Sequence, residues 1–304
     1  MENRMIIRKL FSKLEESRMV HKYANITYFE LGLRYILKRY DCFSVTSRTG
    51  IFFENINLSN LSHISYLLDH GWRILSQERN FITVRAESGV TITSRTNKGF
   101  DLGHIVEIYI KKEYGENFEK NNIIDVGMSN GDSSIYFAIC GAKKVVGIEP
   151  TQESFELAVR NIRENGLQDK IIAINKAVTP HSGQTELFAY PDSPNANSID
   201  SENIVHLGSK KVKFTVQGIR LEDIIDMFDG EPVNLLKMDC EGCEYSILQS
   251  LKTDSYKKIQ KLVLEYHNGL QELPNLLKKM GYEVLVSKSN SSMGFIKAEK
   301  VRHN

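Results

Sequence analysis

The sequence contains little cysteine: Cys42, Cys140, Cys240 and Cys243 are the four among 304 residues. Four cysteines are too few for a disulfide-stabilised scaffold of this size. Cys240 and Cys243 have CxxC spacing, but zinc sites usually need four ligands and the sequence has no second pair. We therefore expect neither a zinc site nor a redox role for this pair. Cys140 lies in an apolar run, where it packs as a small hydrophobic residue.

The sequence also has almost no net charge and no long apolar run. The 39 Lys and Arg residues almost balance the 38 Asp and Glu residues, which leaves +1 at pH 7. Such a chain has no overall field that would draw it onto nucleic acid or anionic lipid, so we expect neither as a partner. The first 18 residues carry a charge every few positions, unlike a signal peptide, and no run approaches membrane-spanning length. We expect a cytoplasmic protein without a membrane span.

Composition and element order predict an α/β protein in two parts. Hydrophobic residues make up 41% of the chain and charged residues 25%, which is ordinary for a protein with a sizeable core. Residues 1–100 mix short helical and strand-like segments without a βαβ series, and we expect a small α+β region that could cap an active site. Residues 101–304 alternate apolar strands with helices, which is typical of a Rossmann-like, doubly wound parallel sheet.

Apolar runs divide the second part into elements. A helix over 101–115 leads into the sheet, and a polar loop over 191–203 is long enough to be functional. Ligands of such sheets bind outside the carboxyl ends of the strands. The predicted strands are 122–127, 144–150, 170–178, 211–219, 233–240, 261–267, 282–287 and 291–299.

The first group of candidate site residues surrounds a glycine turn. Asp125 ends a strand, and Gly127 and Gly131 follow before a helix, so a ligand can lie against the backbone and the helix N-terminus. Asp125 would repel a pyrophosphate and attract the ammonium of a methionine moiety. Glu149 ends the next strand, at the separation from which an acid reaches ribose hydroxyls. Two simpler readings stay open: a tight strand-to-helix connection, and Glu149 as a cap of the helix near Thr151.

The second group gathers acids and a histidine at the ends of two later strands. Lys237, Asp239, Glu241 and Glu244 occur in LLKMDCEGCEYSIL, and Glu265 and His267 occur in LVLEYHNG. Alternation along a strand makes Glu265 and His267 point to the same side. Carboxylates that converge on one edge are costly unless they bind a cation, take protons or receive hydrogen bonds. The simpler alternative is that the glutamates begin a helix and that His267 packs in the core.

These segments, in this order, resemble the FkbM family of methyltransferases. The resemblance rests on DVGMSNGDSS, GIEP, the stretch from INKAV to ELF, VQGIRLEDII, LLKMDCEGCEYSIL and LEYH, and covers about residues 100 to 290. It implies a class I methyltransferase fold closed by a reversed hairpin, S-adenosylmethionine as cofactor, and a hydroxyl of a sugar, lipid or small metabolite as acceptor. Asp125, Gly127, Ser129, Gly131, Glu149 and Ala177 would then bind the cofactor. The chain departs from the family at Met128 and Ser129, where side-chain contacts are open.

Methyl transfer to an alcohol needs a group that removes the hydroxyl proton. His267 is the candidate base, because its ordinary pKa is near neutrality, and Asp239 or Glu241 could act instead if its pKa is raised. Alternatively, Asp239, Glu265 and His267 could hold a divalent metal that lowers the pKa of the hydroxyl.

Two other functions use the same fold. A nicotinamide-dependent oxidoreductase would need a glycine loop without Asp125 at its strand end. A non-catalytic scaffold would need no acidic edge.

Overall fold

The computed structural model describes the chain except residues 1, 38–40, 190–211, 268, 289–292 and 302–304. The predicted polar loop at 191–203 lies outside the described residues. The chain forms two compact units, Met1–Lys112 and Glu113–Asn304. The helix predicted to lead into the sheet is thus part of the first unit. Among the described residues, no helix combines the length and apolar character needed to cross a membrane.

The N-terminal unit is the expected α+β region. Two short antiparallel sheets, β1–β2 and β3–β4–β5, accompany helices whose apolar faces form its core. Arg95 and Asp101 are fully buried and joined by two side-chain hydrogen bonds of 2.8 Å, which fixes α4 to the end of β5. This pair explains why the segment after residue 100 belongs to the first unit. The elements are α1 (Glu2–Tyr23), α2 (Tyr28–Ile36), β1 (Phe43–Thr46), β2 (Phe52–Ile56), α3 (Leu58–Asp69), β3 (Arg73–Glu78), β4 (Phe81–Arg85), β5 (Thr91–Arg95), α4 (Asp101–Ile105) and the π-helix η1 (Val106–Ile110).

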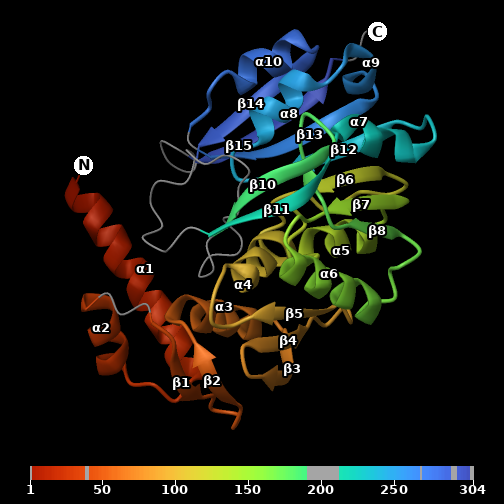
Figure 1. Cartoon of the computed structure of the whole chain (residues 1–304). Coiled ribbons are helices and arrows are strands. Elements are labelled where there is room, and N and C mark those ends of the chain that lie inside the picture. The colour runs from red at the N-terminus through yellow and green to blue at the C-terminus, as the bar shows by residue number, and fades with distance from the viewer. Residues whose placement is uncertain (1, 38–40, 190–211, 268, 289–292, 302–304) are drawn as a thin grey trace. The chain divides into compact units, whose positions relative to one another are not determined.

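The C-terminal unit is built on a seven-stranded sheet with the order β14-β15-β13-β12-β6-β7-β8 (Figure 1). All neighbours from β13 to β8 are parallel, and β15 is antiparallel to both β13 and β14. This reversed hairpin confirms the expected class I methyltransferase fold. The strands are β6 (Asn122–Val126), β7 (Lys144–Ile148), β8 (Ile171–Ile174), β12 (Val233–Met238), β13 (Ile259–Tyr266), β14 (Tyr282–Lys288) and β15 (Gly294–Lys300).

Helices cover the sheet because its central strands are apolar on both faces. Ile124 and Val146 face one layer, where they share a buried core with side chains of α7, α8 and α10. Ile123 and Val145 alternate with them and are fully buried on the opposite face, where α5 and α6 pack. The remaining elements are α5 (Asp132–Ile139), α6 (Gln152–Glu164), β9 (Ala177–Val178), β10 (Gly183–Ala189), β11 (Val212–Ile219), α7 (Leu221–Ile225), the 3-10 helix η2 (Asp226–Phe228), α8 (Glu244–Ser250), α9 (Thr253–Tyr256) and α10 (Leu273–Lys279). Strands β9, β10 and β11 form a separate small sheet.

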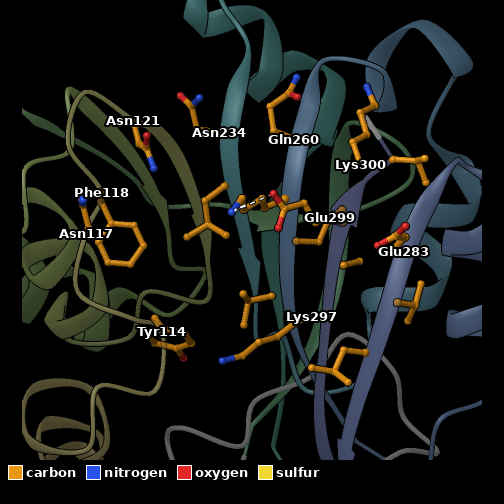
Figure 2. A pocket seen from close by; sticks show the side chains of 18 residues that line it. Tyr114, Asn117, Phe118, Asn121, Asn234, Gln260, Glu283, Lys297, Glu299 and Lys300 are labelled. Carbon is orange, nitrogen blue, oxygen red and sulfur yellow. Dashed lines mark ion pairs between the residues drawn. The ribbon is translucent and has the colours of Figure 1, made fainter. Parts of the chain in front are cut away.

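A groove of about 910 Å³ lies over β12, β13, β14 and β15. Figure 2 shows Lys297 and Glu299 of β15 in its wall, with Tyr114 and Phe118 on the segment that borders it. Lys261 Nζ and Glu299 Oε1 form a 3.1 Å ion pair on this surface, and both side chains are about half exposed. As the structure describes it, none of the site residues predicted from the sequence lines this groove.

Candidate functional site

The parallel strands β6, β7, β12 and β13 bring their carboxyl ends to one edge of the sheet. Val126 pairs with both Ile148 and Met238, and Met238 pairs with Leu264, so the residues that follow these positions are neighbours across the edge. The two groups predicted from the sequence therefore lie on adjacent strands of one edge. We call residues 127–131 the glycine loop, and Asp239, Glu241, Glu265 and His267 the rim cluster.

The glycine loop depends on glycine at its first position. Gly127 has φ +77°, and a Cβ there would lie 2.0 Å from the carbonyl oxygen of Asp239. No other residue type fits, because both the backbone conformation and the contact with Asp239 exclude a side chain. Gly131 has φ +85° directly before α5, so the loop ends at the positive end of that helix. Met128 is fully buried against Gly147 of β7, so this departure from the family pattern is a packing residue.

Asp125 supports the loop from inside the sheet. Its side chain is fully buried, and its Oδ2 accepts 2.6 Å hydrogen bonds from the hydroxyls of Ser133 and Ser134. Its Oδ1 lies 3.1 Å from Nζ of Lys237, which also donates a 2.7 Å hydrogen bond to the carbonyl of Gly127. The sequence suggested direct attraction of a ligand's ammonium. In the structure the charge of Asp125 is balanced by Lys237, and direct contact of Asp125 with a ligand stays a prediction.

Lys237 links the second group of residues to the glycine loop. It was predicted beside Asp239 and Glu241, and the structure directs its ammonium toward β6 and the glycine loop. Burial acts to lower the pKa of Lys237, and the carboxylates of Asp125 and Asp239 outweigh it, so its pKa lies above the usual value. Lys237 therefore stays charged and anchors the loop. The separation of 112 residues from Asp125 hides this pair from local sequence patterns.

Glu149 links the second strand to the glycine loop. Its Oε2 accepts a 3.1 Å hydrogen bond from the backbone N–H of Ser129, and its Oε1 accepts a 2.9 Å hydrogen bond from that of Thr151. Glu149 thus holds both the residue that precedes α6 and the glycine loop. Ala177 lies elsewhere: it is buried in β9 and pairs with Gly218 of β11. Its predicted contact with a cofactor stays a prediction.

The rim cluster is formed by two strand ends. Nε2 of His267 lies 3.4 Å from Oε2 of Glu241 and 3.9 Å from Oε1 of Glu265. One ligand atom each of Asp239, Glu265 and His267 lies within 4.8 Å of the others, so the three residues predicted as possible metal ligands do converge. Burial lowers the pKa of His267, with partial compensation by Asp239, so the imidazole is neutral near pH 7 and can accept a proton or a metal.

A tight turn between β12 and α8 positions Glu241. Glu241 has φ +57° and Gly242 φ +105°, and the flanking Cys240 and Cys243 are joined by a disulfide with a Cα–Cα distance of 5.6 Å. The CxxC spacing alone did not predict this bond. Burial raises the pKa of Glu241 well above its usual value, and the neighbouring carboxylates, Asp239 first, add to the effect.

Glu244 fastens the same turn from α8. Its Oε1 accepts a 3.1 Å hydrogen bond from the backbone N–H of Cys240 and a 3.4 Å hydrogen bond from that of Gly242. Burial raises the pKa of Glu244 to about 7, although these hydrogen bonds oppose the rise. Glu244 is therefore a structural acid of the turn.

Tyr114 is a candidate that sequence reasoning missed. Burial raises the pKa of its phenol well above the usual value, and the carboxylates of Asp239 and Asp125 contribute to the rise. Its ring packs at 5.6 Å, between centroids, from that of Phe137 on α5. Tyr114 therefore brings a neutral hydroxyl close to the acids of the sheet edge. It stands in a loop without a recognisable motif, so the sequence offered no signal for it.

Comparisons with known proteins identify relatives of this chain. The family model described as "Methyltransferase FkbM domain" matches residues 125–284, more than half of the chain. Methyltransferase sdnD of Sordaria araneosa is 23% identical over 190 residues, which cover 53% of this chain and 73% of the relative. Hexuronic acid methyltransferase AglP of Haloferax volcanii is 22% identical over 185 residues, with 60% and 72% covered. A solved structure, methyltransferase FkbM from Methylobacillus flagellatus KT, is 15% identical, with 64% and 47% covered and a TM-score of 0.44.

Proposed function

The chain belongs to the FkbM methyltransferase family, and on that premise we propose that it transfers a methyl group from S-adenosylmethionine to a hydroxyl of a sugar, lipid or other small metabolite. The observation that carries the proposal is the shared sheet edge: the glycine loop with Glu149 lies on β6 and β7, beside the rim cluster on β12 and β13. A cofactor held at the first pair of strands would present its reactive end toward the second pair.

The residues of the glycine loop fit this cofactor. The loop exposes backbone at a left-handed turn before α5, and the Glu149 carboxylate stands at the end of β7, where ribose hydroxyls require an acceptor. Ser129 contributes its backbone N–H to Glu149, while Asp125 and Lys237 hold the loop from inside. When bound, the cofactor supplies a methyl group on a positively charged sulfur, and the sulfur keeps the electron pair of the broken bond.

The rim cluster prepares the acceptor. An alcohol is a weak nucleophile, so its proton must leave as its oxygen bonds to the methyl carbon. In one arrangement His267, neutral near pH 7, takes this proton directly, with Glu241 3.4 Å away to stabilise the imidazolium. Asp239 or Glu241 is the alternative base. In a second arrangement a divalent metal bound by Asp239, Glu265 and His267 lowers the pKa of the hydroxyl.

The name of one relative bears on the acceptor class. The relative in Haloferax volcanii is named for hexuronic acid, which supports a sugar as acceptor. The balanced net charge supports a partner other than nucleic acid, and that exclusion stays a prediction, as do the cytoplasmic location and a capping role for the N-terminal unit.

A methyl-transfer assay with the full chain tests the proposal. Sugars and sugar acids with free hydroxyls are incubated with S-adenosylmethionine, and products are examined by mass spectrometry and NMR for a new O-methyl group. His267→Ala should abolish most turnover and leave the affinity for S-adenosylhomocysteine near that of the wild type. Methylation of nitrogen alone would refute the proposed acceptor chemistry, and an unchanged rate in His267→Ala would remove this histidine from the reaction.

A further inference from the structure

We infer that Asp239, Glu265 and His267 bind a divalent cation of the Mn²⁺ type at the rim. Asp239 and His267 directly follow the adjacent parallel strands β12 and β13, Glu265 lies near the end of β13, and each of the three offers one ligand atom within 4.8 Å of the other two. Ligand distances of about 2.0–2.3 Å place two atoms bound to the same ion at most about 4.6 Å apart, so small rotations of these side chains suffice to bring all three ligand atoms onto one ion. Three protein ligands leave positions open for water and for an acceptor oxygen.

His267 points independently to a ligand. Only 10% of its side chain is exposed, and its Nδ1 has no hydrogen-bond partner among the described residues. A buried ring nitrogen without a partner is costly, because it loses water and gains nothing in return. Its other nitrogen, Nε2, lies between Glu241 at 3.4 Å and Glu265 at 3.9 Å. Nε2 is therefore the ring nitrogen that faces the carboxylates, and an ion between Nε2 and Glu265 would coordinate both of them.

The charge of the rim also favours a cation. Asp239, Glu241 and Glu265 bring three carboxylates to one imidazole, and like charges at such distances repel strongly where water is partly excluded. The buried ammonium of Lys237 is engaged by Asp125 and by the carbonyl of Gly127. Within the described part of the chain, no lysine or arginine nitrogen lies within 4.0 Å of the Asp239 carboxylate.

The donor set selects the kind of ion. Two carboxylates suit Mg²⁺, Ca²⁺ and Mn²⁺, whereas an imidazole suits transition metals better than Mg²⁺ or Ca²⁺. Mn²⁺ accepts both donor types. The role of the ion in the reaction rests on the proposed function. A hydroxyl bound to the ion would lose its proton more easily, and Glu241 lies beside the site to receive that proton. The binding itself does not depend on methyl transfer and can be measured alone.

Titration of Mn²⁺ into chelator-treated, desalted full-length protein tests the site. Electron paramagnetic resonance of free Mn²⁺ should show one ion bound per chain, and pulsed measurements on the wild type should show coupling to a histidine ¹⁴N. Asp239→Asn should weaken binding by at least about tenfold. The matched control Asp254→Asn, whose side chain is 97% exposed, should bind as the wild type does.

Several outcomes would overturn the inference: no bound Mn²⁺, equal affinity in Asp239→Asn and Asp254→Asn, or bound Mn²⁺ without ¹⁴N coupling. The pulsed measurement needs no variant, so misfolding cannot obscure it. Calorimetry with S-adenosylhomocysteine on the same samples separates the two proposals. If the protein binds S-adenosylhomocysteine but does not bind Mn²⁺, only the cation site is refuted. If it binds Mn²⁺ but does not bind S-adenosylhomocysteine, the proposed function is refuted and the cation site is supported.

Discussion

Replacing Lys237 with methionine should destabilise the protein through the loss of one buried charge. The Lys237 side chain is 4% exposed and that of Asp125 is fully buried, with Nζ and Oδ1 3.1 Å apart. Removal of one partner of such a pair typically costs about 3–5 kcal/mol, because the other charge remains buried without compensation. Two serine hydroxyls still donate to Asp125, so we expect the lower end, about 3 kcal/mol.

Urea unfolding followed by far-UV circular dichroism measures this effect. With a slope of about 3 kcal/mol per molar urea, Lys237→Met should lower the midpoint by roughly 1 M. Lys261→Met is the matched control, since its ion pair with Glu299 is about half exposed and is worth less than about 1 kcal/mol. Adding Asp125→Asn to Lys237→Met should recover part of the loss, because it removes the uncompensated charge.

The same substitution should weaken the cofactor site. Nζ of Lys237 donates to the carbonyl of Gly127, and a hydrogen bond with a charged donor is worth about 1.5–3 kcal/mol. Affinity for S-adenosylhomocysteine should therefore fall by about tenfold or more in Lys237→Met. If Lys237→Met and Lys261→Met have the same urea midpoint and the same affinity, the argument that Lys237 anchors the glycine loop is refuted.

Three further predictions concern other parts of the chain. Burial lowers the pKa of His63 to about 4 from 6.5, so between these pH values the unfolded chain binds a proton that the folded chain does not. The free energy of unfolding of the N-terminal unit should therefore fall by about 3 kcal/mol from pH 6.5 to pH 4. Unfolding followed by the fluorescence of Trp72 measures this fall, and His63→Leu should remove most of it. Gly127→Ala should abolish binding of S-adenosylhomocysteine in calorimetry, because its Cβ would displace the carbonyl of Asp239; retained binding would contradict this. Reduction of the disulfide between Cys240 and Cys243 should loosen the turn and speed hydrogen exchange of residues 239–243, whereas equal exchange in both states would show that the bond does not hold the turn.

Much of the C-terminal unit could be predicted because its signals are local. Buried parallel strands are short apolar runs, and β6, β7 and β12 begin and end close to the predicted positions. The reversed hairpin of β14 and β15 also followed from two alternating segments after a helix. The convergence of Asp239, Glu265 and His267 followed from their places at the carboxyl ends of adjacent strands.

The features that the sequence did not reveal depend on contacts between side chains that local sequence patterns do not show. Asp125 and Lys237 are in contact across neighbouring strands, so the buried surroundings of Asp125 were not visible in the sequence, and its expected contact with a ligand stays a prediction. The end of the first unit depends on the buried pair of Arg95 and Asp101, which joins a strand to the following helix. The disulfide depends on a turn geometry that spacing alone leaves open.

Calorimetry with S-adenosylhomocysteine and NAD, on separate samples of the full chain, is the most direct test of the account. We predict that S-adenosylhomocysteine binds with one site per chain, that Glu149→Ala weakens this binding because the acceptor for the ribose is lost, and that NAD does not bind. Binding of NAD in place of S-adenosylhomocysteine would indicate an oxidoreductase, and binding of neither would indicate a scaffold. Either result would contradict the proposal that this sheet edge holds a methyl donor.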